Sequence, residues 1–171
     1  MKKITILMML ILFGLTAQLT YGQSDKPSDK ETLVKAAQIL EAQPFHEKAK
    51  DFRGWAMRYV IETDDVSIII CSQMVSAVLE KKNKYSSELL AQYSIGMAAF
   101  KLSNPDKAKD ENAAQLAGME SMLRAFENMV KEKPKAKFQA LDELVTKRNN
   151  GELKMFVENA KCGEGKTDPI N

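Results

Sequence analysis

The chain is poor in the residues that most enzymes use for metal binding or nucleophilic catalysis. Its 171 residues include one histidine, His46, and two cysteines. A metal site built on several histidines is therefore excluded, and a serine–histidine or cysteine–histidine pair would have to rely on His46. That histidine lies in a Pro-Phe-His-Glu helix junction at residues 44–47, where a surface or capping role is commoner than a role as base. We expect no metal site and no cofactor.

An excess of charge of one sign is missing as well. The full chain has 25 basic and 23 acidic residues. Removal of an N-terminal signal peptide would take away Lys2 and Lys3 and no acidic residue, which leaves 23 residues of each sign. A protein that binds nucleic acid without sequence preference needs a basic face for the phosphates. The balanced charge therefore argues against a nucleic-acid partner.

The chain also lacks a hydrophobic run of the roughly 20 residues that are needed to cross a bilayer. Its long apolar run, residues 4–15, is interrupted only by Thr5 and Gly14, follows two lysines and gives way to small and polar residues up to Gly22. Basic head, apolar middle and small-residue exit are the order of a secretory signal peptide. We predict cleavage after Gly22, a mature chain that begins at Gln23 and has no membrane span, and a periplasmic or secreted bacterial location.

Export makes the two cysteines informative. Oxidising compartments favour disulfides, and an even number of cysteines indicates pairing. We therefore predict a disulfide between Cys71 and Cys162, which would tie the end of the chain to the core; the alternative is two separate buried thiols. The two residues lack the Cys-x-x-Cys spacing of a redox pair.

Apolar residues recur with the helical period along most of the chain, which predicts an all-α fold of six or seven helices in a compact array of antiparallel hairpins. Asp29 is the expected N-cap of the first helix, and Asn104 with Pro105 is the expected start of the longest. The helices are expected from residue 31 to the proline at 44, then over about 47–62, 66–79, 86–103, 105–132, 138–149 and 153–162.

One stretch has two interpretations. Residues 58–71 are rich in β-branched side chains, and a Thr-Asp-Asp sequence at 63–65 could form the turn of a β-hairpin. We favour a helix over 66–79 instead, because the apolar run continues beyond the length of one typical strand. On that interpretation Thr63 or Asp64 would cap the helix.

Two segments resemble tetratricopeptide-type helical hairpins. GMAAFKLSNPDKAKD and SMLRAFENMVKEKPKAKF each place an aromatic residue inside a helix and a proline after it. The similarity covers residues 87–145, but its two prolines are 29 residues apart, whereas that family repeats every 34 or so. The resemblance implies stacked helical hairpins, and we transfer no binding residues from it.

The domain organisation follows from these patterns. We expect a signal peptide at 1–22, a flexible lead-in at 23–30, a single helical domain at 31–162 and a loose tail at 163–171. Gly96 and Gly118 lie inside predicted helices, where glycine is disfavoured by about 1 kcal/mol relative to alanine. We therefore predict that one of them is buried where the two helices cross.

Trp55, Arg58 and Tyr59 fall close together on one predicted helix. They are the candidate ligand-binding residues, because an aromatic face with a cation beside it suits the wall of a cleft. The alternative is that the two aromatic residues belong to the core, with only their polar tips at the surface.

Glu62, Asp64 and Asp65 form an acidic cluster at the end of the same helix. Paired carboxylates can act as acid and base in a hydrolase. The simpler interpretation is a capped helix junction with an ion pair between Arg58 and Glu62. The sequence thus identifies no catalytic residue.

The leading functional hypothesis is a non-enzymatic interaction or ligand-binding module that uses a groove between helical hairpins. Its expected partner is a protein or peptide in the cell envelope. One alternative is a small envelope hydrolase that uses the carboxylates at 62, 64 and 65, and another is a purely structural envelope protein.

Overall fold

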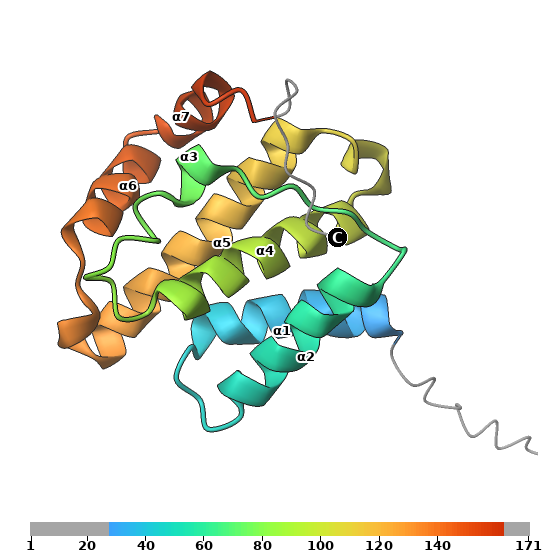
Figure 1. Cartoon of the computed structure of the whole chain (residues 1–171), viewed down its shortest axis with the longest axis horizontal. Coiled ribbons are helices and arrows are strands. Elements are labelled where there is room, and N and C mark those ends of the chain that lie inside the picture. The colour runs from blue at the N-terminus through green and yellow to red at the C-terminus, as the bar shows by residue number, and fades with distance from the viewer. Residues whose placement is uncertain (1–27, 163–171) are drawn as a thin grey trace, which may run out of the picture.

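The structure is a computed structural model that describes residues 28–162, and the predicted signal peptide and C-terminal tail lie outside this range. Within it the chain forms seven α-helices, two 3-10 helices and no strand, so the predicted all-α fold is confirmed (Figure 1). The elements are α1 (Asp29–Ala42), α2 (Ala49–Glu62), α3 (Ser72–Val75), α4 (Ser86–Ser103), η1 (Pro105–Lys107), α5 (Glu111–Glu132), η2 (Pro134–Ala136), α6 (Gln139–Asn149) and α7 (Leu153–Asn159).

The antiparallel pair of α4 and α5 forms the centre of the molecule (Figure 1). Gly96 and Gly118 are both buried where the two helices cross. A Cβ atom at Gly96 would lie 2.5 Å from the Cβ of Ser121, and one at Gly118 would lie 2.8 Å from the backbone oxygen of Tyr93. Only glycine allows backbones to approach this closely, so the predicted role of these glycines is confirmed.

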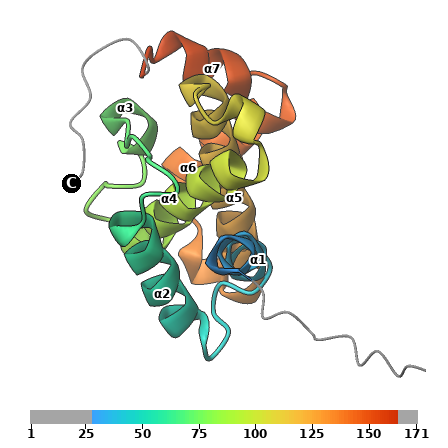
Figure 2. The same ribbon diagram turned by 90° about the vertical axis from the view of Figure 1, so that its right-hand side faces the viewer.

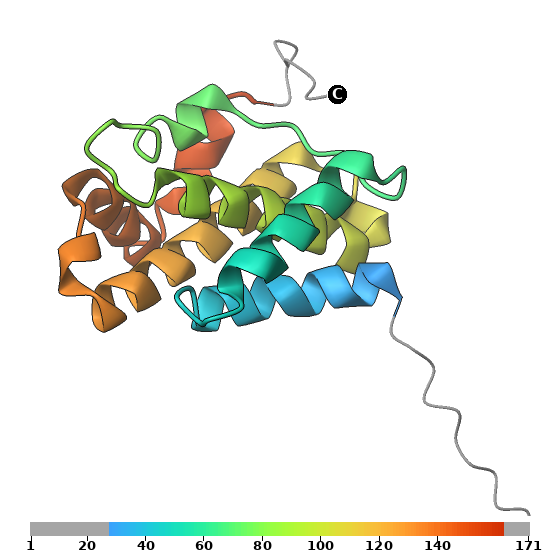
Figure 3. The ribbon, with the colours of Figure 1, turned by 60° about the horizontal axis from the view of Figure 1, so that its bottom comes forward.

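The remaining helices cover the central pair from two sides. α1 contacts both α4 and α5, and α2 contacts α1 and α4; Figure 3 shows α2 lying obliquely across them. α6 and α7 pack against α5 on the other side, and Figure 2 shows α7 at the end of the molecule opposite α1 and α2. The core is accordingly divided into one cluster beneath α1 and α2 and a larger one beneath α3, α6 and α7.

Two helix starts differ from the predictions. Ser28 rather than Asp29 caps α1, because its hydroxyl and the carboxylate of Glu31 form a reciprocal capping box; residues 29–30 thus belong to α1 rather than to a lead-in. The proline after Asn104 begins the 3-10 helix η1, and α5 starts later, at a second cap where the Asp110 carboxylate accepts the amide hydrogen of Ala113.

The helix predicted over 66–79 is wrong, and so is the alternative hairpin. Residues 63–71, which we call the α2–α3 connection, turn at Asp64 and Asp65 and then run extended across α4 without a partner strand. Within the range predicted to be helical, only the four residues of α3 form a helix. Thr63 is the C-cap of α2 rather than the N-cap of a following helix, and its hydroxyl accepts the amide hydrogen of Asp65 in a tight turn. The connection avoids helix because side chains from α4 and α5 bind its backbone, as described next.

Candidate functional site

Two buried side chains hold the inner edge of the α2–α3 connection. The Lys101 ammonium on α4 donates to the carbonyl oxygen of Ser67 at 2.9 Å, and the Gln115 amide on α5 donates to the carbonyl oxygen of Ile69 at 2.7 Å. These two carbonyls are two residues apart, which is the period at which an extended chain presents its backbone to one side. The connection therefore lies as an edge strand would, with its inner edge bound by side chains.

A third anchor holds the end of the connection. The Tyr93 hydroxyl on α4 donates to the amide oxygen of Gln115 and accepts the backbone N–H of Cys71. Burial raises the pKa of Tyr93, so its hydroxyl stays protonated and able to donate. Gln115 thus uses both halves of its amide in this network, which places the connection relative to α4 and α5.

A buried ion pair completes the network. The Lys101 ammonium lies 2.5 Å from a carboxylate oxygen of Glu111, and the lysine side chain is 5% exposed. A buried ammonium needs such a partner because of its desolvation cost. Lys101 therefore links the first turn of α5 to the connection.

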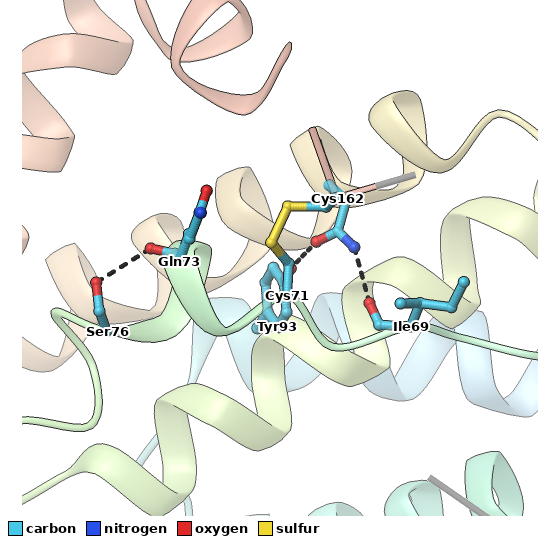
Figure 4. The surroundings of a disulfide bond; sticks show 7 residues. Ile69, Cys71, Gln73, Ser76, Tyr93 and Cys162 are labelled. Atoms are coloured by element: carbon cyan, nitrogen blue, oxygen red, sulfur yellow. Dashed lines mark hydrogen bonds between the residues drawn. A yellow bond between two sulfur atoms is a disulfide. The ribbon is translucent and has the colours of Figure 1, made fainter. Parts of the chain in front are cut away.

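The predicted disulfide is confirmed in the structure. Cys71 and Cys162 are bonded, with Cα atoms 5.6 Å apart. Figure 4 shows Cys71 between this bridge and Tyr93. The bond ties the last residue of the connection to the chain just beyond α7, so the connection is fixed covalently at one end.

A groove of about 360 Å³ lies along the outer edge of the connection. It is bounded by the last turns of α2, by the connection itself and by Ser94 of α4. Ile61, on its rim, is 62% exposed. The lining residues are Met57, Val60, Ile61, Glu62, Thr63, Asp64, Val66, Ser67, Ile68, Ile70 and Ser94.

The candidate ligand-binding residues on α2 lie mostly outside this groove. Trp55 and Tyr59 stack with ring centroids 5.9 Å apart and pack partly against the core. Tyr59 instead lines a separate shallow hollow of about 420 Å³ with Lys30 and Asp65, whereas Trp55 and Arg58 line neither of the two. The three residues therefore do not share one cleft.

The acidic cluster spans the two hollows. Glu62 and Asp64 line the groove, and Glu62 also borders the shallow hollow that Asp65 lines. Asp65 turns away, where it lies 2.9 Å from the Lys30 ammonium and accepts the Tyr59 hydroxyl at 2.9 Å. Hydrogen bonds from Lys30 and Tyr59 hold the pKa of Asp65 below its usual value, which is the wrong direction for a general acid.

The predicted ion pair between Arg58 and Glu62 does not form. Among the ion pairs of residues 28–162, none includes Arg58, Glu62 or Asp64. The two carboxylates at the groove therefore remain available to a cation from outside.

The anchors Lys101, Gln115 and Tyr93 are not among the site residues that the sequence pattern predicts. A signal was present, because a lysine and a glutamine that fall on the buried face of an amphipathic helix need buried partners. The sequence does not say which backbone groups those partners are.

A larger hollow of about 500 Å³ lies between α5, η1 and α7. Lys107 and Lys154 line it together with Asp110, Glu120 and Glu158. Since both signs of charge are mixed around it, this hollow selects a ligand less clearly than the groove does.

No protein-family model, characterised protein or solved structure matches the chain, so the tetratricopeptide resemblance is not confirmed. Between residues 28 and 162, no helix has the length and apolar character that a bilayer crossing requires. The same residues contain no group of three or more histidine, cysteine or acidic side chains placed to hold a metal ion.

Proposed function

We propose that the protein is an exported bacterial binding module that holds a peptide segment of a partner protein in the groove between α2 and the α2–α3 connection. The groove itself carries this proposal. Its volume lies in the usual range of ligand sites, and apolar side chains share its lining with a few polar groups, as in most such sites.

The rim of the groove indicates the character of the ligand. Ile61 exposes most of its side chain to water, and exposed apolar surface beside a groove marks interaction sites. Glu62 and Asp64 add two carboxylates without an ion-pair partner among the described residues. An apolar peptide with a lysine or arginine suits this combination.

Two observations support export. The disulfide between Cys71 and Cys162 suits an oxidising compartment, and the first 22 residues have the order of a signal peptide. The hydrolase alternative has less support, because Asp65 is already engaged by Lys30 and Tyr59.

Peptide titration of the purified, oxidised protein tests the proposal. The probes are three acetylated pentapeptides that begin with lysine, glutamine or glutamate and continue with alternating valine and threonine. Isothermal titration calorimetry measures the affinity of each peptide. We expect the lysine peptide to bind at least tenfold more tightly than the glutamate peptide, and Ile61→Lys to abolish binding. The matched control is Ile39→Lys, because Ile39 is also exposed but lies on α1, away from the groove. Equal affinity of all three peptides, or no binding at all, contradicts the proposal.

A further inference from the structure

We infer that the groove takes its peptide as an extended strand, which pairs with the free outer edge of the α2–α3 connection. This inference rests on the proposed function and specifies how the ligand is held. Main-chain pairing of this kind is a known mode of peptide recognition at exposed strand edges.

The first support is the state of the backbone. Among the hydrogen bonds of the described residues, none involves the main chain of Ile68 or Ile70. The carbonyls of Ser67 and Ile69 point inward to Lys101 and Gln115. Because an extended chain alternates its backbone groups between its two edges, those of Ile68 and Ile70 face outward.

The second support is access to that edge. Ile68 and Ile70 both line the groove, so a peptide that lies in the groove is next to these two residues. Backbone N–H and C=O groups almost always find a partner in proteins or in water. Ile68 and Ile70 together offer two backbone N–H donors and two backbone C=O acceptors on the same edge, which is the pattern that another strand can match.

The third support is rigidity. The side chains of Ile68 and Ile70 pack against the core, and the disulfide fixes Cys71 at the end of the connection. The edge is therefore ordered before a ligand arrives, which lowers the entropic cost of binding. Edge strands that stay free in natural proteins are usually blocked by charge or by a bulge, and the connection has neither along 66–70.

Charge selects the occupant. Glu62 and Asp64 lie at the end of the groove where the connection begins, and no cation lines the groove. An extended segment of another protein, with apolar residues at alternate positions and a lysine or arginine at one end, would place its cation beside these carboxylates. Like-charge repulsion would disfavour an acidic strand.

A pair of N-methylated peptides provides the test. N-methylation removes a main-chain donor and leaves the side chains unchanged. In the lysine pentapeptide, methyl groups on residues 2 and 4 block one edge of the strand, whereas methyl groups on residues 3 and 5 block the other. We expect one of the two peptides to lose at least tenfold in affinity while the other stays near the parent peptide.

Equal affinities of the two methylated peptides, whether high or low, would overturn strand pairing. If the parent lysine peptide binds in the groove with that result, the proposed function survives without this inference. If the parent peptide itself does not bind, both fail. The two proposals are thus distinguished within one experiment.

Amide hydrogen exchange gives an independent readout. In the free protein the amides of Ile68 and Ile70 should exchange rapidly while that of Cys71, bonded to Tyr93, is protected; the parent peptide should slow the first two. Protection of Ile68 and Ile70 without peptide, in dilute protein, would show that the chain's own termini occupy the edge. Protection that grows with protein concentration would indicate a second copy. Either result overturns the inference.

Discussion

The α4–α5 hairpin and the α2–α3 connection are both central to the fold, but they satisfy their backbones in opposite ways. The two helices bond their own N–H and C=O groups and meet through small residues, with Gly96 and Gly118 at the crossing. Between its end residues Thr63 and Cys71, the connection makes no backbone–backbone hydrogen bond, and its backbone is bound instead by the side chains of Lys101, Gln115 and Tyr93.

This difference explains why only the connection is open to a partner. A helix leaves no main-chain group free except at its ends, so the hairpin offers a partner no backbone to pair with along its length. Hydrogen bonds from α4 and α5 side chains hold one edge of the connection, whereas the main chain of Ile68 and Ile70, which line the groove, has no hydrogen-bond partner among the described residues. The hairpin therefore acts as the support, and the connection is the surface that it presents.

The largest effect is expected from removal of the disulfide. Replacing both Cys71 and Cys162 with alanine should lower the free energy of unfolding by about 2–5 kcal/mol, because the bond closes a long loop between residues 91 positions apart. A denaturant melt measures the change. Hydrogen exchange should show that α3 and α7 lose protection while α4 and α5 keep theirs; uniform loss over all helices would contradict the assigned division between hairpin and connection.

The next effect concerns the hairpin alone. Gly118→Leu should destabilise the protein by about 3 kcal/mol, the upper end of the usual cost of overpacking. The upper end applies because the new side chain would meet the backbone oxygen of Tyr93, which cannot move aside as a flexible side chain can. A thermal melt gives the change. Gly54→Ala on α2 is the matched control, because no atom lies within 4 Å of the new Cβ, and it should stabilise the helix by about 0.5–1 kcal/mol. A Gly118→Leu variant that melts at or above the parent temperature contradicts the close crossing.

A smaller effect tests how the hairpin holds the connection. Tyr93→Phe removes the hydroxyl that serves Gln115 and Cys71, and it should cost about 1–2 kcal/mol because buried polar groups are left without a partner. Tyr85→Phe is the control: Tyr85 packs against Phe45 through its ring, so the substitution should leave stability unchanged. Equal melting temperatures of the two variants would show that the hydroxyl of Tyr93 does not anchor the connection.

The same contrast explains what the sequence could predict. The helices were predictable because each depends on a local period and on caps a few residues away, and the disulfide because two cysteines in an exported chain have one possible pairing. The connection was not, because its partners Lys101 and Gln115 are 34 and 46 residues from the carbonyls they bind. A β-branched run suits strand and buried helix alike, and tertiary context decides between them.

The candidate site shows the same limit. Acidic residues at 62, 64 and 65 were visible in the sequence, but the ion pair of Asp65 was not, because its partner Lys30 lies in the first turn of α1. Trp55 and Tyr59 were visible as an aromatic pair, yet they stack on each other rather than line the groove. The spacing of these residues in the sequence identified them as a group, but it could not predict which hollow or neighbour each side chain would face.

The smallest effect is expected at the start of the connection, where Lys30 and Asp65 form an exposed ion pair. Contact with Asp65 raises the pKa of Lys30, and contact with Lys30 lowers the pKa of Asp65. The contribution of Asp65 is therefore present above its usual value of 3.8 and is lost as pH falls through its lower folded pKa. That of Lys30 is present below 10.5 and is lost as pH rises through its higher folded pKa.

A double-mutant cycle with Lys30→Met and Asp65→Asn measures this coupling through thermal melts. We expect a small favourable coupling between about pH 5 and 9 that weakens in high salt, because exposed pairs are screened by water and ions, and that is lost as pH falls through the lowered folded pKa of Asp65. Since the disulfide holds the other end of the connection, peptide affinity should change little in either single variant. A coupling that stays unchanged after the Asp65 carboxylate has been fully protonated would mean that the two residues interact through packing rather than charge. A large loss of peptide affinity would mean instead that this end of the connection, like the end at Cys71, must be fixed for the edge to bind.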